Sequence, residues 1–271
     1  MRPMVPPDYP DDPIAEPVHK GRGALSNETS RYDTEKRIRT TDGWEAEVAA
    51  AAEDDELPPL RTTLTRDATR TILARNSSPD IPFDRSINPY RGCEHGCIYC
   101  FARPTHAYLG LSPGLDFETK ILFKPEAAKL LAAELAAPKY RCDVIAMGTN
   151  TDPYQPVERE LKVTRQILRV LSDFNNPVGI VTKGHLVTRD IDILGDMARR
   201  NLAEVFVSIT TLDRDLARAM EPRAAIGDYD AAPDVDELAR GIERAVARLT
   251  TVSAGHWRST PVGTLALVQG G

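Results

Sequence analysis

Gly92-Cys93-Glu94-His95-Gly96-Cys97-Ile98-Tyr99-Cys100 is the most chemically committed stretch of this 271-residue sequence. It contains three of the four cysteines of the chain, in the spacing C-x3-C-x2-C. Three thiolates this close in sequence are suited to hold metal. A [4Fe–4S] cluster normally takes four cysteine ligands, so three local ligands and no obvious fourth predict a cluster with one iron open. An open iron can bind a substrate or a cofactor.

A structural zinc site is the main alternative for this triplet. His95, His106 or Cys142 could complete a tetrahedron, but zinc usually takes two separated ligand pairs, and the sequence has no second pair. Haem attachment would need histidine directly after Cys100, where Phe101 stands. A bacterial ferredoxin run would need a fourth nearby cysteine, so the spacing excludes both haem attachment and that run.

The triplet resembles the signature of the radical S-adenosylmethionine (radical SAM) superfamily, which places an aromatic residue, here Tyr99, before the last cysteine. Residues 88–103, residues 151–156 (Thr-Asp-Pro-Tyr-Gln-Pro) and residues 181–183 (Val-Thr-Lys) are similar to the branch that contains the spore photolyase-like proteins. The resemblance covers about residues 84–223. It implies a (β/α) barrel and a [4Fe–4S] cluster that Cys93, Cys97 and Cys100 hold.

The same resemblance implies a reaction. Members of the superfamily cleave S-adenosylmethionine (SAM) reductively to a 5′-deoxyadenosyl radical, which takes a hydrogen atom from a substrate. The protein mainly orients the reactants and excludes water, so we assign no acid–base catalytic residue. The resemblance also implies a one-electron reductant of the flavodoxin or ferredoxin type as a partner, and it leaves the substrate unknown.

The composition is that of an ordinary globular protein, with 41% hydrophobic and 27% charged residues. The sequence has no run of about 18 apolar residues, and prolines and acids stand where a signal peptide would be basic and then apolar. We therefore expect a cytoplasmic protein with no membrane partner. In that compartment three close thiols are expected to bind metal rather than to form disulfides.

The charge distribution bears on DNA as a substrate. The net charge is −6, and residues 1–60 hold 14 acids against 7 Lys and Arg, which gives −7 for that segment and +1 for the remainder. A nearly neutral core argues against a strongly basic nucleic-acid groove, although a local basic patch is compatible with it. The charge therefore gives DNA no support as a substrate.

We predict three regions along the chain. Residues 1–63 are expected to be a mostly disordered, acidic and proline-rich tail, with one short helix at 43–52. Residues 64–223 are expected to form the radical SAM core, and residues 224–271 an atypical C-terminal segment.

Short apolar runs alternate with amphipathic stretches in the core, which predicts an α/β fold, here a partial (β/α) barrel. The expected strands are 86–90, 143–148, 178–182 and 204–209, and the expected helices are 125–137, 158–171 and 190–200.

The sequence departs from the family after Arg223, where another helix and two further apolar strands would follow. An acidic patch, a helix-like stretch at 235–249 and one candidate strand within 260–269 stand there instead. We therefore expect an incomplete barrel, from a truncated or frameshifted product or from a chain that needs a partner.

Polar residues follow the expected strands, at the edge where parallel α/β sheets bind ligands. Lys183 offers a charge for the SAM carboxylate and Ser208 a hydroxyl. Gly148, Thr149 and Asn150 can bond the amine and the ribose. By resemblance, Tyr99 is expected near the adenine.

Three further points concern the reaction. Thr149 stands where spore photolyase has a cysteine that returns a hydrogen atom to its product, which speaks against the photolyase reaction. Cys142, at the other end of the second strand, is expected to be a buried small apolar residue. Glu221-Pro222-Arg223 resembles an acidic-Pro element of the branch, or is a helix stop with a surface ion pair.

Three functions follow from these observations. The first is a radical SAM enzyme of unknown substrate, and the second is a spore photolyase-like DNA lesion lyase. The third, which the unusual C-terminal segment motivates, is a catalytically inactive iron–sulfur protein.

Overall fold

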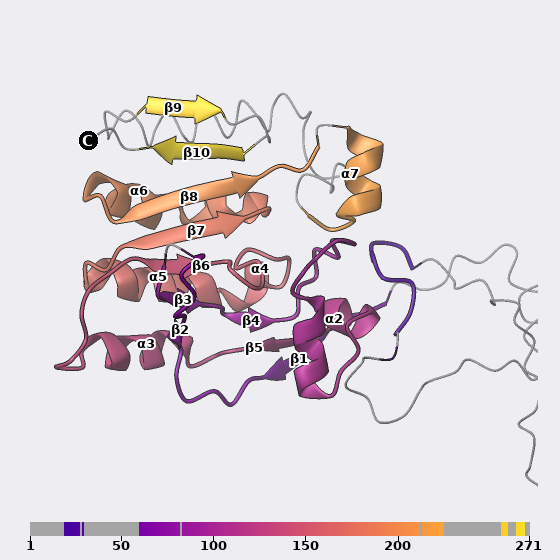
Figure 1. Ribbon diagram of the computed structural model, residues 1–271, viewed down its shortest axis with the longest axis horizontal. Helices are drawn as coiled ribbons and strands as arrows, with labels where there is room; N and C mark the ends of the chain where they lie inside the picture. Colours follow the sequence, from indigo (N-terminus) through magenta and orange to yellow (C-terminus); the bar gives the residue numbers. More distant parts are fainter. Residues whose placement is uncertain are drawn as a thin grey trace, which may run out of the picture.

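The structure of the protein is a computed structural model that describes residues 19–27, 29, 60–81, 83–211 and 213–224 (Figure 1). It also describes the backbone of two further strands, His256–Ser259 and Thr264–Val268. The helices expected at 43–52 and 235–249 lie outside the described residues, as does most of the expected disordered tail.

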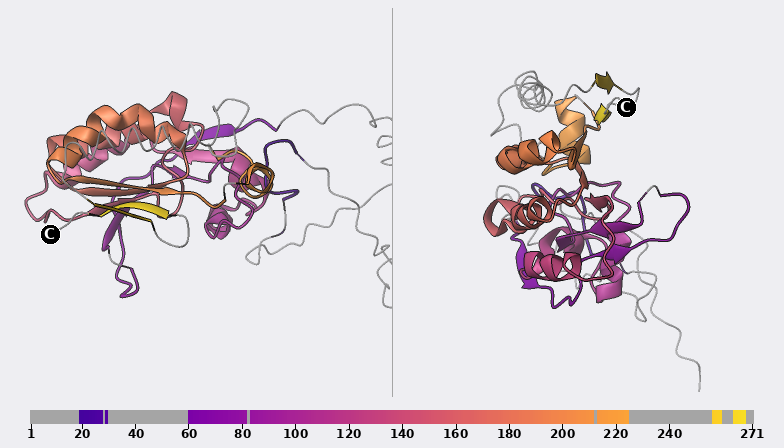
Figure 2. Two further views of the ribbon diagram at one scale, coloured as in Figure 1. Left: turned by 90° about the horizontal axis from the view of Figure 1, so that it is seen from above. Right: turned by 90° about the vertical axis from the view of Figure 1, so that its left-hand side faces the viewer.

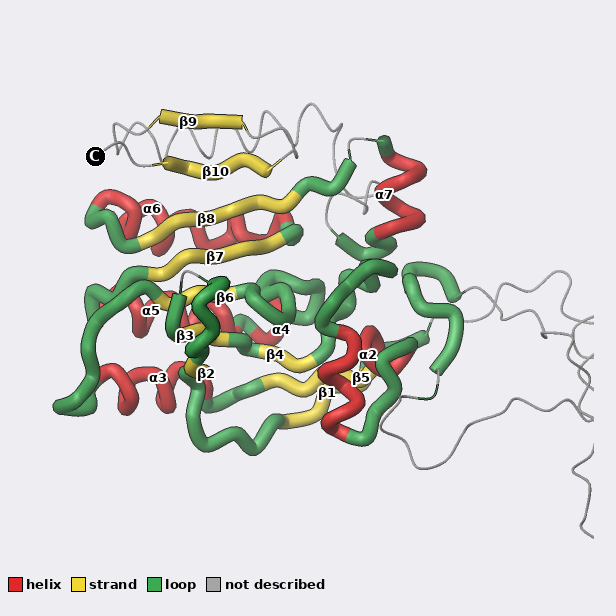
Figure 3. The backbone as a smooth tube through the Cα atoms, in the orientation of Figure 1, coloured by secondary structure: helices red, strands yellow, loops and turns green. Residues whose placement is uncertain are grey.

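A seven-stranded sheet forms the centre of the fold, in the order β2-β3-β6-β7-β8-β10-β9. The four middle strands β3, β6, β7 and β8 run parallel to one another, and β2 and β10 pair antiparallel at the two flanks. Figure 3 shows β7, β8, β10 and β9 one beside the next in that order. The bounds are β2 Ala74–Arg75, β3 Arg85–Ile87, β6 Ile145–Met147, β7 Val178–Thr182, β8 Ala203–Ser208, β9 His256–Ser259 and β10 Thr264–Val268. This arrangement confirms the α/β class and the parallel strands that the sequence predicts.

Helices α3 (Ala127–Leu135), α5 (Val163–Asp173) and α6 (Ile191–Arg199) lie along one face of this sheet (Figure 2). Their apolar stripes pack onto the short strands, where Ile87, Ile145 and Ile180 are fully buried. α5 connects β6 to β7, and α6 connects β7 to β8; because β3 is also parallel to β6, the carboxyl ends of the four strands meet at one edge of the sheet. None of the helices in the described part of the chain is long and apolar enough to cross a membrane.

The expected strand 86–90 is two strands in two different sheets. β3 ends at Ile87, and β4 (Tyr90–Arg91) begins after Pro89, which has no N–H to donate to a sheet. β4 pairs with β5 (Lys120–Phe123), and β5 pairs with β1 (Thr63–Arg66), to form a small three-stranded sheet. The sequence did not predict this second sheet.

The expected helix 158–171 is also interrupted. α4 (Glu158–Leu161) ends at Lys162, whose φ is 54°, and α5 begins at Val163. The buried Glu158 carboxylate accepts hydrogen bonds from Thr164 N at 3.0 Å and Arg165 N at 3.4 Å. It therefore caps the first turn of α5, because the first N–H groups of a helix have no partner within the helix.

The C-terminal strand expected within 260–269 is present as β10. It pairs antiparallel with β8, with Thr264 opposite Ser208, and β9, which was not predicted, pairs with β10. The fourth parallel strand is therefore not an edge of the sheet. The remaining elements are η1 (Arg103–Leu109), α2 (Leu115–Thr119), η2 (His185–Asp190) and α7 (Arg214–Met220).

Candidate functional site

The cysteine loop, residues 92–100, directly follows β4. Cys93 is buried, Cys97 and Cys100 are half-buried, and all three are free thiols. Burial raises the pKa of Cys97 and of Cys100, and the neighbouring Cys93 raises both further. Metal binding to these thiols would therefore have to release protons.

Gln155 fixes the backbone on both sides of Cys93. The side chain of Gln155 is completely buried; its Oε1 accepts from Glu94 N at 3.0 Å, and its Nε2 donates to Gly92 O at 3.1 Å. Cys93 N donates to Phe117 O at 2.9 Å. The position of Cys93 is therefore set by the protein itself.

A buried pair, His95 and Asp152, joins the cysteine loop to the end of β7. His95 Nδ1 lies 3.4 Å from Asp152 Oδ2. Asp152 also accepts from Thr182 Oγ1 at 2.6 Å and from Lys183 N at 2.7 Å. Burial would lower the pKa of His95, but the Asp152 carboxylate and the Cys93 thiol raise it to about 10. The pair is thus an internal ion pair that fixes the loop beside Lys183.

Of the alternative zinc ligands, His95 lies within the cysteine loop itself, whereas His106 and Cys142 have partners elsewhere. His95 bonds Asp152, and His106 Nε2 bonds Lys120 O at 3.0 Å. Among the residues that the structure describes, no three His, Cys, Asp or Glu side chains converge on one point that could hold a single metal ion. The thiolate donors of the triplet are the ligand type that iron–sulfur clusters take, and each cysteine of such a cluster binds a different iron.

Cys142 corrects an expectation. It is exposed, not buried, because it precedes the first residue of β6, Ile145, and lies outside the sheet. Its Sγ lies 3.5 Å from Asn176 Oδ1. It stands at the amino end of the strand, away from the cysteine loop.

Tyr99, Lys183 and Ser208, which the sequence predicts as one site, do lie together. Lys183 Nζ donates to Ser208 Oγ at 3.0 Å and to Thr210 Oγ1 at 2.9 Å, and it lies 5.7 Å from the centre of the Tyr99 ring. Glu221 joins the group: its Oε1 is 2.8 Å from Lys183 Nζ and accepts from the Tyr99 hydroxyl. Burial raises the pKa of Glu221 to about 7 and lowers that of Lys183.

The segment Glu221-Pro222-Arg223 docks on the cysteine loop. Glu221 is only 2% exposed, which excludes a surface ion pair for it. Arg223 N donates to His95 O at 3.1 Å, and Arg223 Nη1 donates to Glu94 Oε1 at 3.1 Å. The chain after β8 therefore covers the loop.

Gly148, Thr149 and Asn150 follow β6 at the same edge of the sheet. Gly148 has a φ of +87°, and a Cβ there would lie 2.0 Å from Val181 O, so only glycine fits between β6 and β7. Asn88 holds the other two: its Nδ2 donates to Thr149 Oγ1 at 3.3 Å, and its Oδ1 accepts from Asn150 N at 3.0 Å.

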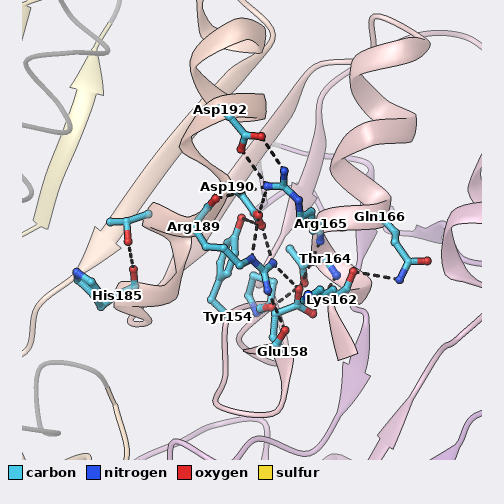
Figure 4. A network of polar contacts seen from close by, with 12 residues as sticks. Tyr154, Glu158, Lys162, Thr164, Arg165, Gln166, His185, Arg189, Asp190 and Asp192 are labelled. Carbon is cyan, nitrogen blue, oxygen red and sulfur yellow. Dashed lines mark hydrogen bonds and ion pairs between the residues drawn. The ribbon is translucent and has the colours of Figure 1, made fainter. Parts of the chain in front are cut away.

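A network of buried charges supports the segment 151–156 (Figure 4). Glu158 and Asp190 are both 0% exposed, and Arg189 bonds each of them at 2.7 Å. Arg165 bonds Asp190 at 2.7 Å, and the Tyr154 hydroxyl donates to Asp190 at 3.2 Å. The network thus holds the hydroxyl of Tyr154, which stands next to Gln155 and close to Asp152 in the sequence.

Sequence reasoning gave no role to Asp152, Gln155, Arg103 and Glu118. Asp152 and Gln155 could have been found from the sequence, because they lie in the polar segment 151–156 that follows the buried strand β6. For Arg103 and Glu118, the structure supplies the only signal, because their contacts are made in three dimensions.

Three comparisons relate this chain to known proteins. The family model of the radical SAM superfamily matches residues 87–253. An uncharacterised protein of Mycobacterium tuberculosis is 42% identical over 141 residues, which are 52% of this chain and 42% of that protein. An uncharacterised protein of Methanocaldococcus jannaschii is 29% identical over 136 residues, which are 50% of this chain and 48% of that protein.

The chain thus spans less than half the length of these curated relatives. Among solved structures, a spore photoproduct lyase complexed with dinucleoside spore photoproduct aligns with a TM-score of 0.37 and 12% identity, over 76% of this chain and 74% of that one.

Proposed function

The chain belongs to the radical SAM superfamily, and from this premise we propose that it binds a [4Fe–4S] cluster through Cys93, Cys97 and Cys100 and cleaves SAM reductively. The observation that carries the proposal is the cysteine loop itself. Its three free thiols stand in one short loop, and buried polar partners hold the backbone of that loop. When bound, the cluster would supply the single electron that releases a 5′-deoxyadenosyl radical for hydrogen abstraction from a substrate.

The residues at the strand ends are proposed to hold SAM. Lys183 and Ser208 would bind its carboxylate, because an ammonium and a hydroxyl 3.0 Å apart form a pair of donors. The Glu221 carboxylate lies 2.8 Å from Lys183 Nζ, so the SAM carboxylate would have to compete with it for Lys183. Tyr99 would pack near the adenine, and residues 148–150 would bond the amine and the ribose.

The proposal includes a partner and leaves the substrate open. We propose a small one-electron donor of the flavodoxin or ferredoxin type, acting in the cytoplasm. Thr149 stands at the position of the hydrogen-donating cysteine of spore photolyase, and its hydroxyl also accepts a bond from Asn88. These two features of Thr149 give no support to a reaction that cleaves a DNA lesion. We therefore propose hydrogen abstraction from a substrate and nothing more specific.

Anaerobic reconstitution with iron and sulfide, followed by dithionite and SAM, tests the proposal. We expect about four irons per chain and release of 5′-deoxyadenosine, measured by chromatography. A bound cluster without cleavage would instead support an inactive iron–sulfur protein. Zinc in place of iron would overturn the proposal.

Replacing Lys183 with alanine is expected to weaken SAM binding about 10- to 100-fold, because a hydrogen bond to a charged group contributes about 1.5–3 kcal/mol. Equilibrium binding of SAM to the reconstituted variant measures this loss, and iron content is expected to stay at the wild-type level. Lys129→Ala, at an exposed lysine on α3, is the matched control. Equal affinities of the two variants would remove Lys183 from the SAM site.

A further inference from the structure

We propose that residues 19–27 form a strap that holds the cysteine loop in place, with Glu118 as its positioning residue. The strap precedes the segment that the family model matches and lies beside α2 (the indigo segment in Figure 1). The docking of the strap is independent of the proposed function. Its effect on a bound cluster rests on that function.

Glu118 connects the strap to the core. Its carboxylate is completely buried and accepts from Gly23 N at 3.0 Å, from Ala24 N at 2.9 Å and from Arg103 Nη2 at 2.5 Å. A buried carboxylate is stable only when it is paired and hydrogen-bonded. The two strap amides therefore supply part of the hydrogen bonding that the buried Glu118 carboxylate needs.

Arg103 carries this connection to the thiols. The guanidinium that bonds Glu118 also donates to Cys97 O at 2.9 Å and to Gly96 O at 3.3 Å. The carbonyls of Gly96 and of the second cysteine, Cys97, are thus held by an arginine that is itself bonded to Glu118. A shift of Glu118 would release the loop at Cys97.

The strap also touches the loop directly. A Cβ on Gly23 would lie 1.8 Å from Gly96 O, a distance that real side chains do not reach. The backbone of the strap therefore lies flat against the backbone of the loop, and only glycine permits it. Such close backbone contact excludes water from this side of the loop.

Arg22 fixes the strap on the side of the first cysteine. It is 6% exposed, and it donates to Glu118 O at 2.8 Å and to Thr62 Oγ1 at 3.0 Å. Thr62 Oγ1 in turn bonds the Glu94 carboxylate, next to Cys93. The strap thus reaches the loop through side chains as well as through its backbone.

The other end of the strap is paired with α2. Asn27 Nδ2 donates to Asp116 at 3.0 Å, and Asp116 N donates back to Asn27 Oδ1 at 2.8 Å. Leu115 N donates to Ser26 O at 3.0 Å. The strap is thus hydrogen-bonded to the core at Gly23 and Ala24 and again at Asn27, so it is fixed at two places beside the cysteine loop.

Iron leaves the site when its bonds to the thiolates break, and thiolates that stay in place can bind it again before it escapes. A strap that fixes the backbone at Gly96 and Cys97 helps to keep the thiolates in place, so it should slow loss of iron without changing how many irons bind. This effect separates a positioning role from a ligand role, because loss of a ligand lowers the iron content itself.

The variant Gly23→Ala tests the strap, because the added Cβ would clash with Gly96 O. Its matched control is Gly179→Ala in β7, where an added Cβ meets nothing within 4 Å; neither glycine has a positive φ. Glu118→Gln, which keeps the shape and removes the charge, is the second variant, and Glu126→Gln at an exposed glutamate is its control.

Hydrogen exchange of the metal-free full chain is the first measurement. We expect the strap and the cysteine loop to be protected in the wild type and in both controls, and to lose protection together in Gly23→Ala and Glu118→Gln. Rapid exchange of residues 19–27 in the wild type would overturn the proposal. This measurement decides on the docking of the strap even if the wild type binds no cluster.

Release of iron from the reconstituted protein to a ferrous chelator is the second measurement. Loss of one charge-assisted bond predicts release about tenfold faster in both strap variants, at an unchanged initial iron content. The Tm of the metal-free protein is measured beside it to separate local loosening from global unfolding. Equal release rates for Gly23→Ala and Gly179→Ala would refute the role of the strap in holding the cluster.

Discussion

Cys93→Ala is expected to abolish cluster binding and SAM cleavage, whereas Cys142→Ala is expected to leave both at the wild-type level. Cys93 is buried within the loop, and Gln155 and Phe117 fix its backbone. Two remaining thiols cannot hold a cluster that already lacks a fourth protein ligand. Cys142 is exposed at the amino end of β6 and gives a control with the same chemical change.

The measurements are iron per chain after anaerobic reconstitution and 5′-deoxyadenosine formed with dithionite and SAM. The Tm of each metal-free variant checks that the fold is intact, since removal of a buried thiol also costs some packing. If Cys93→Ala retained the iron content of the wild type, the ligands would have to be other than the triplet. Loss of iron in both variants would place Cys142 among the ligands and contradict its position in the structure.

Much of the sheet could be predicted because each parallel strand is marked by a short apolar run in its own stretch of sequence. β7 has the predicted bounds, 178–182, since a short apolar run ends there at a polar turn. Strand 86–90 was predicted as one piece, because the pairing of Tyr90 with Phe123 in a second sheet leaves no trace in the alternation of residues. Helix 158–171 was predicted as continuous because helical periodicity does not show that the Glu158 carboxylate caps α5.

The candidate site divides in the same way. The three cysteines lie close together in the sequence, and the strand-end residues follow from the rule for parallel sheets, so both could be predicted from the sequence. The partners that hold the loop were not. Arg22 and Glu118 are 96 positions apart, and no periodicity connects them. A buried glutamate also looks like an exposed one in a sequence, because its burial depends on partners from other segments.

The second large effect is expected for Glu158→Ala, which should destabilise the protein by about 3 kcal/mol. Glu158 is fully buried, and its carboxylate pairs with Arg189, accepts from the Tyr90 hydroxyl and caps Thr164 N. Removal of one partner from a buried ion pair leaves the others without their acceptor, and that cost exceeds the value of an exposed pair. We place the effect at the low end of the range for buried pairs because Arg189 retains Asp190.

Thermal unfolding of the metal-free protein measures this effect, and about 3 kcal/mol corresponds to a Tm lowered by roughly 6–12 °C for a chain of this size. Asp192→Asn is the control in the same network, because Asp192 bonds Arg165 at 2.7 Å while its side chain is 59% exposed. Exposed pairs contribute at most about 1 kcal/mol, so its Tm should change little. Equal losses in the two variants would mean that burial does not set the strength of this network.

The Glu158 variant also tests how the charge network serves the site. Gln155 and Asp152 bond residues of the cysteine loop, and they flank in sequence Tyr154, which bonds Asp190 of the network. If the network supports them, Glu158→Ala should increase hydrogen exchange in the cysteine loop more than it does in β10, on the far side of β8. Uniform loosening of both would assign Glu158 to general stability alone, since a support for one loop acts on that loop first.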